Sequence, residues 1–402
     1  MTSKRLHWMI WPLVALGLLA LVVGAFEWVA YPRTAWTADT LAANAPQVVL
    51  RGEVDRLHAS FVRAGLLYGV EDHFVYVSRD SGRSFDRIGV IPKIEPSVSE
   101  ALKDFVARRG MVRLLRRSPD AAGVIVLSSG TVLVFYDRIY RMAAGTAVFE
   151  PVEAPTVADV FLGGIAIGPG DTIYFGEYVT GQRPNAPRIL RGSRDGTRWE
   201  EAYTFPPGAI YHVHSVRYDR WRAGYWVATG DQDPETGLWF TADNFRTLDR
   251  IAGGAQEWRV VAPLVREHEL IWGSDDDRGP AGIYRWDMDD RSLARLQTTY
   301  NPSYFAGELS DGTLVITTTY EPESDFSRST SGYPYTSIWA SRDGEAWSEV
   351  LRLQGDAVLE SGRRVRPQIR LPSGDGSLPQ LYATPLWTAS RSLETLILQV
   401  QW

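Results

Sequence analysis

The sequence contains no cysteine among its 402 residues, and lysine is scarce. The absence of cysteine excludes a disulfide scaffold, a thiolate metal site, a cysteine nucleophile and an iron–sulfur cluster. A net charge of −6 excludes a general nucleic-acid binder, because such a protein needs a basic face. The charged content of 22% and the aromatic content of 12% exclude a largely disordered chain.

Turn-forming and strand-favouring residues are plentiful. The chain has 36 glycines, 15 tryptophans and 18 tyrosines, a composition that favours an all-β protein. Its length exceeds that of one ordinary hydrophobic core, unless the core repeats as in a barrel or a propeller.

The N-terminal region predicts a membrane anchor. Residues 8–26 form a run of 19 residues without a charge, which as a helix would span about 28 Å. Lys4 and Arg5 precede the run and Glu27 follows it, so the positive-inside rule keeps the N-terminus in the cytoplasm. We therefore predict that residues 1–31 are a cytoplasmic stub and a single transmembrane signal-anchor helix.

A cleaved signal peptide is the alternative interpretation of this segment. The run is longer than a usual signal-peptide core, and Val23-Gly24-Ala25 is a mediocre cleavage site. With the anchor retained, residues 32–47 are a linker. Residues 48–402 then form a domain outside the cytoplasm, in the periplasm or at the cell surface.

A short pattern with a central aspartate recurs four times, at Ser78–Phe85, Ser193–Trp199, Thr241–Leu248 and Ser341–Trp347. Each copy follows an apolar strand-like run and precedes another strand-like segment. The pattern predicts a hairpin turn in which the aspartate accepts backbone hydrogen bonds, glycine supplies a positive φ and the final aromatic ring packs between sheets. The residues to which we assign this structural role are Ser78, Asp80, Gly82, Phe85, Ser193, Asp195, Trp199, Thr241, Asp243, Ser341, Asp343 and Trp347.

These copies resemble the Asp-box, or BNR repeat, of sialidase-like β-propellers, and the resemblance implies that fold. The aspartates at 80, 195, 243 and 343 are 115, 48 and 100 residues apart, which corresponds to whole numbers of blades with one insertion. Strand–glycine turn–strand pairs fill the gaps and give about seven units, starting near residues 48, 112, 157, 210, 258, 304 and 366. We predict a seven-bladed propeller, with six or eight blades also compatible with the spacing.

Two further features belong to this prediction. Residues 97–109 read as a short helical insertion, because a capping-box sequence precedes an amphipathic stretch. The C-terminal Trp402 is expected to complete a blade shared with the early chain, which would close the ring.

Acidic residues recur at the predicted ends of the second strands, on the face where propellers usually bind ligands. Besides Asp137, these are the candidate catalytic carboxylates Glu177, Asp231, Asp275 and Glu321. Carboxylates at one channel mouth can bind a cation or act on a glycosidic bond. The competing interpretation is that turns are simply rich in aspartate and glycine.

Histidines and aromatic residues begin the innermost strands. His212 and His214 are two residues apart, so on a strand they point to the same side and, with Asp231, can ligate a divalent cation such as calcium, manganese or zinc. Buried histidines that only hydrogen-bond between blades are the alternative. The candidate substrate-binding residues are His212, Trp258, Arg259, Tyr304 and Tyr320.

The resemblance carries over only in part. Sialidases have a Phe/Tyr-Arg-Ile-Pro motif, whereas this chain has Asp86-Arg87-Ile88-Gly89, so a typical sialidase is not expected. A Tyr–Glu pair could come from Tyr320 and Glu321, or from Tyr178 and Glu177. Two functions remain: a membrane-anchored protein that binds or processes carbohydrate, as a glycoside hydrolase or polysaccharide lyase if it is an enzyme, and a non-enzymatic scaffold for another envelope protein.

Overall fold

The structure is a computed structural model that describes residues 46–71, 73–92, 123–136, 138–154, 163–178, 186–322, 334–355, 366–389 and 393–402. All of these lie in one compact unit. The predicted anchor, nearly all of the linker, the helical insertion at 97–109 and Asp137 lie outside the described residues. Within the described ranges, no helix is long and apolar enough to cross a membrane.

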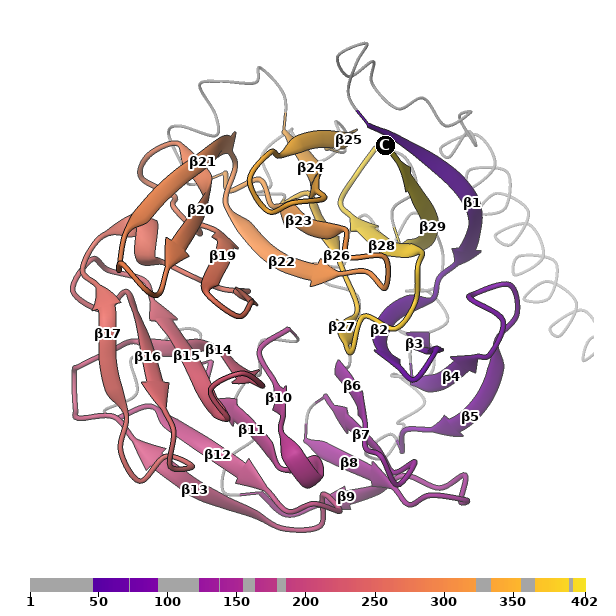
Figure 1. The fold of residues 1–402 in the computed structure, drawn as a ribbon. Helices are drawn as coiled ribbons and strands as arrows, with labels where there is room; N and C mark the ends of the chain where they lie inside the picture. The colour runs from indigo at the N-terminus through magenta and orange to yellow at the C-terminus, as the bar shows by residue number, and fades with distance from the viewer. Residues whose placement is uncertain are drawn as a thin grey trace, which may run out of the picture. The chain divides into compact units, whose positions relative to one another are not determined.

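The described residues form seven sheets arranged in a ring, each built on an antiparallel blade of four strands (Figure 1). Six sheets are built from four consecutive strands, innermost first. The first two blades are β2 (His58–Arg63), β3 (Leu66–Glu71), β4 (Phe74–Ser78), β5 (Asp86–Val90), and β6 (Gly123–Val126), β7 (Val132–Phe135), β8 (Ile139–Met142), β9 (Glu150–Val152). The third and fourth are β10 (Ala166–Ile167), β11 (Ile173–Gly176), β12 (Arg188–Gly192), β13 (Trp199–Thr204), and β14 (His212–Asp219), β15 (Gly224–Gly230), β16 (Gly237–Thr241), β17 (Asp249–Gly253). The fifth and sixth are β18 (Leu264–Val265), β19 (Glu269–Gly273), β20 (Ala281–Asp287), β21 (Leu293–Tyr300), and β22 (Ser303–Glu308), β23 (Leu314–Thr318), β24 (Tyr335–Ser341), β25 (Ser348–Gln354).

The seventh blade joins the two ends of the described chain. It consists of β26 (Gln368–Arg370), β28 (Leu381–Leu386), β29 (Glu394–Gln401) and, outermost, β1 (Gln47–Asp55). β1 pairs antiparallel with β29, and the C-terminus lies beside the start of β1 (Figure 1). The predicted seven blades and the predicted shared closing blade are confirmed.

One boundary of the predicted repeats was wrong. The first unit was expected to start near Val48, but Val48 lies in β1, the outermost strand of the last blade, and the first blade starts at His58. The alternating side chains of a strand indicate that it is a strand, and they do not indicate which sheet it joins.

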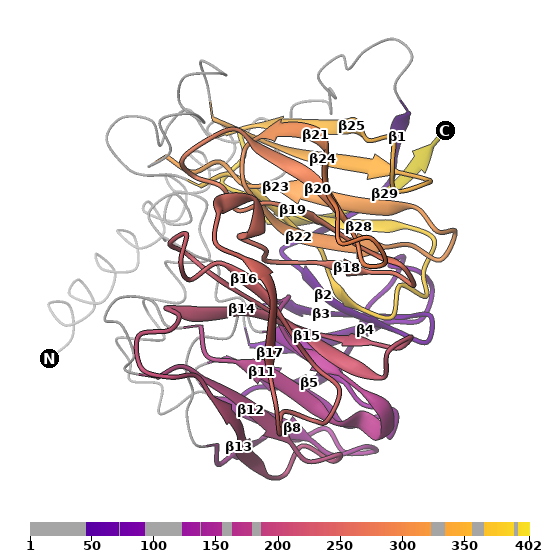
Figure 2. The ribbon, with the colours of Figure 1, turned by 60° about the vertical axis from the view of Figure 1, so that its left-hand side comes forward.

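The core lies between neighbouring blades, which contact one another through their sheet faces. The strands of the fifth and sixth blades lie side by side, with β19 against β22 and β23 (Figure 2). Trp199, at the start of β13, packs against Phe135 of the second blade, with ring centroids 5.8 Å apart. Large aromatic rings at these positions bury much apolar area for each residue.

The four aspartate turns all connect the third and fourth strands of a blade. In the first, Ser78 Oγ and the Ser84 N–H donate to Asp80 Oδ1, at 2.8 and 2.9 Å. Gly82 has a φ of 86°, and in the third copy Phe245 takes its place with a φ of 69°. In a four-stranded meander these turns lie at the opposite end of the blade from the end of the second strand.

Two short 3₁₀ turns complete the described elements, η1 (Pro169–Asp171) and η2 (Gln256–Trp258). A two-residue strand, β27 (Ser373–Gly374), leaves the seventh blade and pairs in parallel with Phe61 and Val62 of β2. This pairing connects the inner strand of the first blade to the seventh blade, in addition to the chain that runs from β1 into β2.

Candidate functional site

The three residues predicted as metal ligands converge at one mouth of the channel. His212 and His214 lie on β14, and Asp231 follows β15, whose last residue pairs with His212. The two histidine Nε2 atoms are 3.0 Å apart, and each lies 3.2 Å from Asp231 Oδ1. Both imidazoles are buried, whereas the Asp231 side chain is 25% exposed and opens the cluster to solvent.

The hydrogen bonding of His214 determines which protons can occupy this cluster. His214 Nδ1 lies 2.8 Å from the carbonyl oxygen of Val260, which can only accept, so Nδ1 carries the proton. Burial lowers the pKa of His214, and the opposing effect of Asp231 does not restore it. The Nε2 atom of neutral His214 therefore presents a lone pair to the Asp231 carboxylate. Both groups are acceptors, so only a proton carried by His212 or a cation can lie between the His214 nitrogen and the Asp231 carboxylate.

Asp231 is held in its charged form. Burial alone would raise its pKa, but the hydrogen bond from His212, the proximity of His214 and the charge of Arg259 outweigh burial and hold the pKa well below its usual range. The cluster therefore brings the Nε2 lone pair of His214, the Nε2 atom of His212 and one carboxylate oxygen to a single point.

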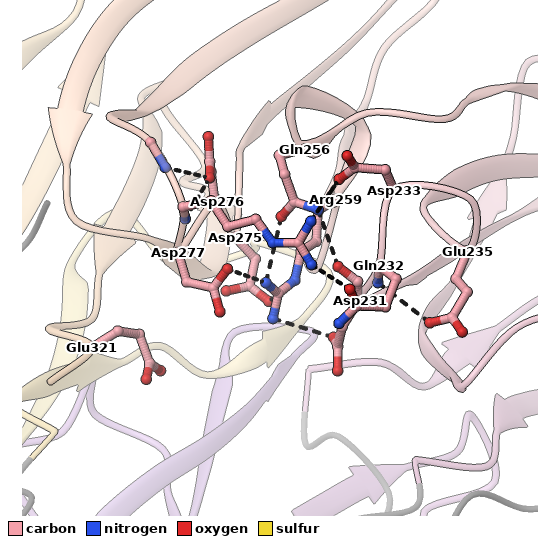
Figure 3. Close-up of polar contacts among 12 residues, drawn as sticks. Asp231, Gln232, Asp233, Glu235, Gln256, Arg259, Asp275, Asp276, Asp277 and Glu321 are labelled. Atoms are coloured by element: carbon pink, nitrogen blue, oxygen red, sulfur yellow. Dashed lines mark hydrogen bonds and ion pairs between the residues drawn. The ribbon is translucent and has the colours of Figure 1, made fainter. Parts of the chain in front are cut away.

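Arg259 links Asp231 to the next blade, as Figure 3 shows. Its Nη2 lies 3.2 Å from Asp231 Oδ1, its Nε 3.0 Å from Asp275 Oδ2 and its Nη1 2.9 Å from Asp277 Oδ1. It directly follows η2, and Gln256 of that turn donates from Nε2 to the Asp231 carbonyl oxygen at 3.1 Å. Each nitrogen of the guanidinium is thus engaged by a carboxylate of the protein, and Arg259 positions Asp231.

Asp275 differs from Asp231 in the direction of its pKa shift. It is fully buried, and burial raises its pKa well above the usual range although Arg259 acts in the opposite direction. Its Oδ1 atom has no hydrogen-bond partner within the described residues. The pKa of Asp231 is thus lowered, whereas the pKa of Asp275 is raised. Opposite shifts of this kind allow one carboxyl group to act as a base and the other as an acid.

The other two predicted acids are each held by an arginine. Glu177 forms a bidentate ion pair with Arg188, with Oε1 2.7 Å from Nη2, and also accepts the Arg188 backbone N–H at 2.8 Å. Glu321 accepts a short hydrogen bond from the Tyr304 hydroxyl and lies 3.2 Å from Arg366. Tyr304, which the sequence did not pair with a glutamate, thus forms a Tyr–Glu contact with Glu321.

Two of the predicted substrate-binding residues, Trp258 and Tyr320, make other contacts. Trp258 is half-buried and packs against Trp272, with ring centroids 5.4 Å apart. Tyr320 is half-buried, and its backbone N–H donates to the Pro367 carbonyl oxygen at 2.9 Å. Neither contact by itself indicates a ligand.

Sequence reasoning missed one residue of the cluster. Tyr178 stacks on His212, with ring centroids 4.2 Å apart and planes inclined by 28°. It was noted only as a neighbour of Glu177, although its position just after β11 places it at the same mouth. The stacking orients the imidazole that faces Asp231.

Comparisons with known proteins do not assign this chain to a family. No protein-family model matches the chain, and no curated protein matches it in sequence. The similar solved structures include a calcium-binding regucalcin from Agrobacterium tumefaciens, with 11% identity over 67% of this chain and 85% of that chain and a TM-score of 0.41. A putative TolB from the same organism has 15% identity over 70% of this chain and 91% of that chain and a TM-score of 0.40. A chain of the mitotic checkpoint complex has 13% identity over 92% of this chain and all of that chain, with a TM-score of 0.48.

Proposed function

We propose that the protein binds a divalent transition-metal ion through His212, His214 and Asp231, and that this mouth of the channel binds or processes carbohydrate. The observation that carries the proposal is the triangle of donor atoms with edges of 3.0, 3.2 and 3.2 Å. Ligands at adjacent positions of a metal ion lie about 3 Å apart, because the bonds to nitrogen and oxygen are about 2.0–2.2 Å long.

The donor set favours zinc or manganese over calcium. Two of the three donors are imidazole nitrogens, whereas calcium prefers a shell of six to eight oxygens. The Val260 carbonyl fixes the tautomer of His214, which is the usual role of a hydrogen-bond partner behind a metal ligand. Three protein ligands leave coordination positions open on the solvent side, as a catalytic or substrate-binding metal requires.

A metal ion there would polarise an oxygen of a bound ligand or activate a water molecule. The chain's own residues would hold the site in shape: Arg259 fixes the Asp231 carboxylate, and Tyr178 stacks on the His212 ring. Asp275, whose pKa is raised by burial, could donate a proton, while Glu321 with Tyr304 forms a second polar group beside it.

The wider proposal concerns family and location. The hydrogen-bonded aspartate turns support membership of the Asp-box, sialidase-like propellers, and the uncharged run at residues 8–26 supports a membrane-anchored domain outside the cytoplasm. Half-buried aromatic residues at this mouth, Tyr178 and Tyr320 among them, support a sugar ligand. A scaffold without a ligand is the weaker alternative, because it does not account for the convergence of Asp231 and the two histidines.

Metal content tests the first part. The purified full-length chain, stripped of metal and then equilibrated with zinc or manganese, is expected to retain about one equivalent of metal. His212→Ala and Asp231→Asn are expected to reduce the affinity by at least tenfold. His268→Ala is the matched control, because His268 is exposed and contacts Asp289 outside the cluster. Equal metal affinity in all four proteins would refute the site.

Glycan binding tests the second part. A glycan array and assays for hydrolysis and lyase cleavage are carried out on the metal-loaded protein and on His212→Ala and Asp231→Asn. Loss of binding or cleavage in both variants, with His268→Ala unchanged, would support carbohydrate as the ligand. Glycan binding that persists in both folded variants would separate the carbohydrate from the metal site and contradict the proposal.

A further inference from the structure

The far half of the channel differs in charge from the mouth that holds Asp231. A cavity of about 760 Å³ opens there, lined mainly by the ends of the innermost strands. Arg217 on β14 lines it, five residues after His212 and therefore about 16 Å further along the strand. Arg63 on β2 and Arg220 line the same cavity. The cavity is thus distinct from the histidine cluster.

Arg217 is unusual among these arginines because nothing in the described protein neutralises it. Arg63 donates to the Val126 carbonyl oxygen and forms an ion pair with Asp171 at 3.1 Å. Arg220 lies over the ring of Trp221, 4.3 Å from its centroid. Arg217 is half-buried and has no hydrogen-bond or ion-pair partner within the described ranges. Burial alone lowers the pKa of Arg217, to about 10.

A second arginine supports an electropositive interior. Arg370 on β26 directly precedes Leu371, which lines the cavity, and its Nη1 atom is buried without a hydrogen-bond partner among the described residues. Burial and the nearby charge of Arg370 lower the pKa of His58 to about 3. His58 is therefore uncharged and does not change the net charge of this region. Neither Arg217 nor Arg370 forms an ion pair in the described part of the chain.

The acids of the cavity do not offset this charge. Asp375 already accepts the N–H groups of Ala64 and Ser377, at 2.7 and 3.0 Å. Glu308 is exposed and forms no ion pair with an arginine of the described ranges. An arginine buried without a partner is unfavourable unless a ligand supplies the anion, and guanidinium matches carboxylate and phosphate through paired hydrogen bonds.

We propose that this cavity binds a small ligand that carries a carboxylate or phosphate group, and that Arg217 forms the ion pair with it. The site is independent of the proposed metal site. The channel then has two ends of opposite character, an acidic mouth suited to a cation and an arginine-lined cavity suited to an anion.

Calorimetric titration of the metal-free full-length protein at pH 7 tests this proposal, with inorganic phosphate in one arm and succinate in the other. We expect saturable binding of at least one anion, and the tighter of the two identifies the group that is recognised. Arg217→Gln is expected to weaken binding at least tenfold. Arg266→Gln is the matched control and should bind as the wild type does, since Arg266 is already paired with Glu269 at 2.9 Å.

A melting experiment separates lost recognition from lost folding. Without anions, Arg217→Gln should melt no lower than the wild type, because an unpaired half-buried charge is removed, and added anion should raise only the wild-type melting temperature. If Arg217→Gln does not fold, Arg217→Lys decides: it keeps the charge without the paired donors and should bind three- to tenfold more weakly. Failure of both anions to bind the wild type, or equal binding by a folded Arg217 variant, would overturn the proposal.

Discussion

Arg259 Nη2 lies 3.2 Å from the same Asp231 oxygen that faces the two histidines. Arg259 leads into the fifth blade, whereas Asp231 and the histidines belong to the fourth. The carboxylate of the proposed metal site is therefore oriented from the neighbouring blade, by a guanidinium whose remaining nitrogens are held by Asp275 and Asp277.

Replacing Arg259 should therefore affect both stability and the proposed metal site. Arg259→Gln leaves Asp275 and Asp231 without their cation in a buried place, and we expect a loss of about 3 kcal/mol in the free energy of unfolding. Metal affinity should fall at least tenfold, measured on the folded variant by competition with a chelating dye. Arg278→Gln is the control, because its ion pair with Asp233 is exposed and should contribute little. Unchanged stability of Arg259→Gln would contradict the network.

The aspartate turns predict a specific sensitivity to acid. Hydrogen bonds from Ser193 and Thr197 lower the pKa of Asp195 from 3.8 to about 2. Because the folded-state pKa is depressed, this contribution to stability is complete above about pH 4 and is lost as the pH falls through about 2. Asp195→Asn should cost about 1 kcal/mol at neutral pH and show a smaller loss of melting temperature between pH 4 and pH 2 than the wild type. Parallel curves for the two proteins would refute this assignment.

Much of the architecture could be predicted because each blade repeats the same local signals. Strand-forming runs, a glycine turn and the aspartate turn lie close together in the sequence, so their spacing predicts seven blades. The convergence of His212, His214 and Asp231 was also accessible: the histidines share one side of a strand, and Asp231 ends the strand paired to it. Both inferences need only the period of a strand and the order of strands in a blade.

The contacts between blades could not be predicted in the same way. The sequence placed β1 in the first repeat, because nothing in its alternating side chains records that it pairs with β29. The three carboxylates around Arg259 come from the loops of two blades, so their meeting depends on the angle between sheets. Arg217 gave no signal at all, since the absence of a partner is a property of the folded protein.

Phe245 offers a test of the third aspartate turn. Its φ of 69° is a conformation that favours glycine, and its ring is buried 4.7 Å from Tyr174 and 5.7 Å from Tyr225, centroid to centroid. Phe245→Ala should cost about 3 kcal/mol, because the ring is lost and the backbone strain remains. Phe245→Gly loses the ring and also the strain, so it should be more stable than the alanine variant by about 1 kcal/mol. Urea unfolding measures both, and the reverse order would contradict a strained turn.

The link from the seventh blade to the first depends on Gly374. Its φ is 131°, and a Cβ there would lie 1.9 Å from the Val62 carbonyl oxygen, which is backbone and cannot move aside cheaply. Gly374→Ala should therefore detach β27 from β2 and lower the free energy of unfolding by about 3 kcal/mol. Gly65→Ala is the matched control: Gly65 has a φ of 77° but nothing within 4 Å of its Cβ position, so only the strain of about 1 kcal/mol is expected.

Hydrogen exchange at the Val62 and Asp375 amides should accelerate in Gly374→Ala alone, because the Asp375 N–H donates to the Val62 carbonyl oxygen at 3.0 Å. Equal melting temperatures for the two variants would mean that the β27 link does not stabilise the closure of the ring.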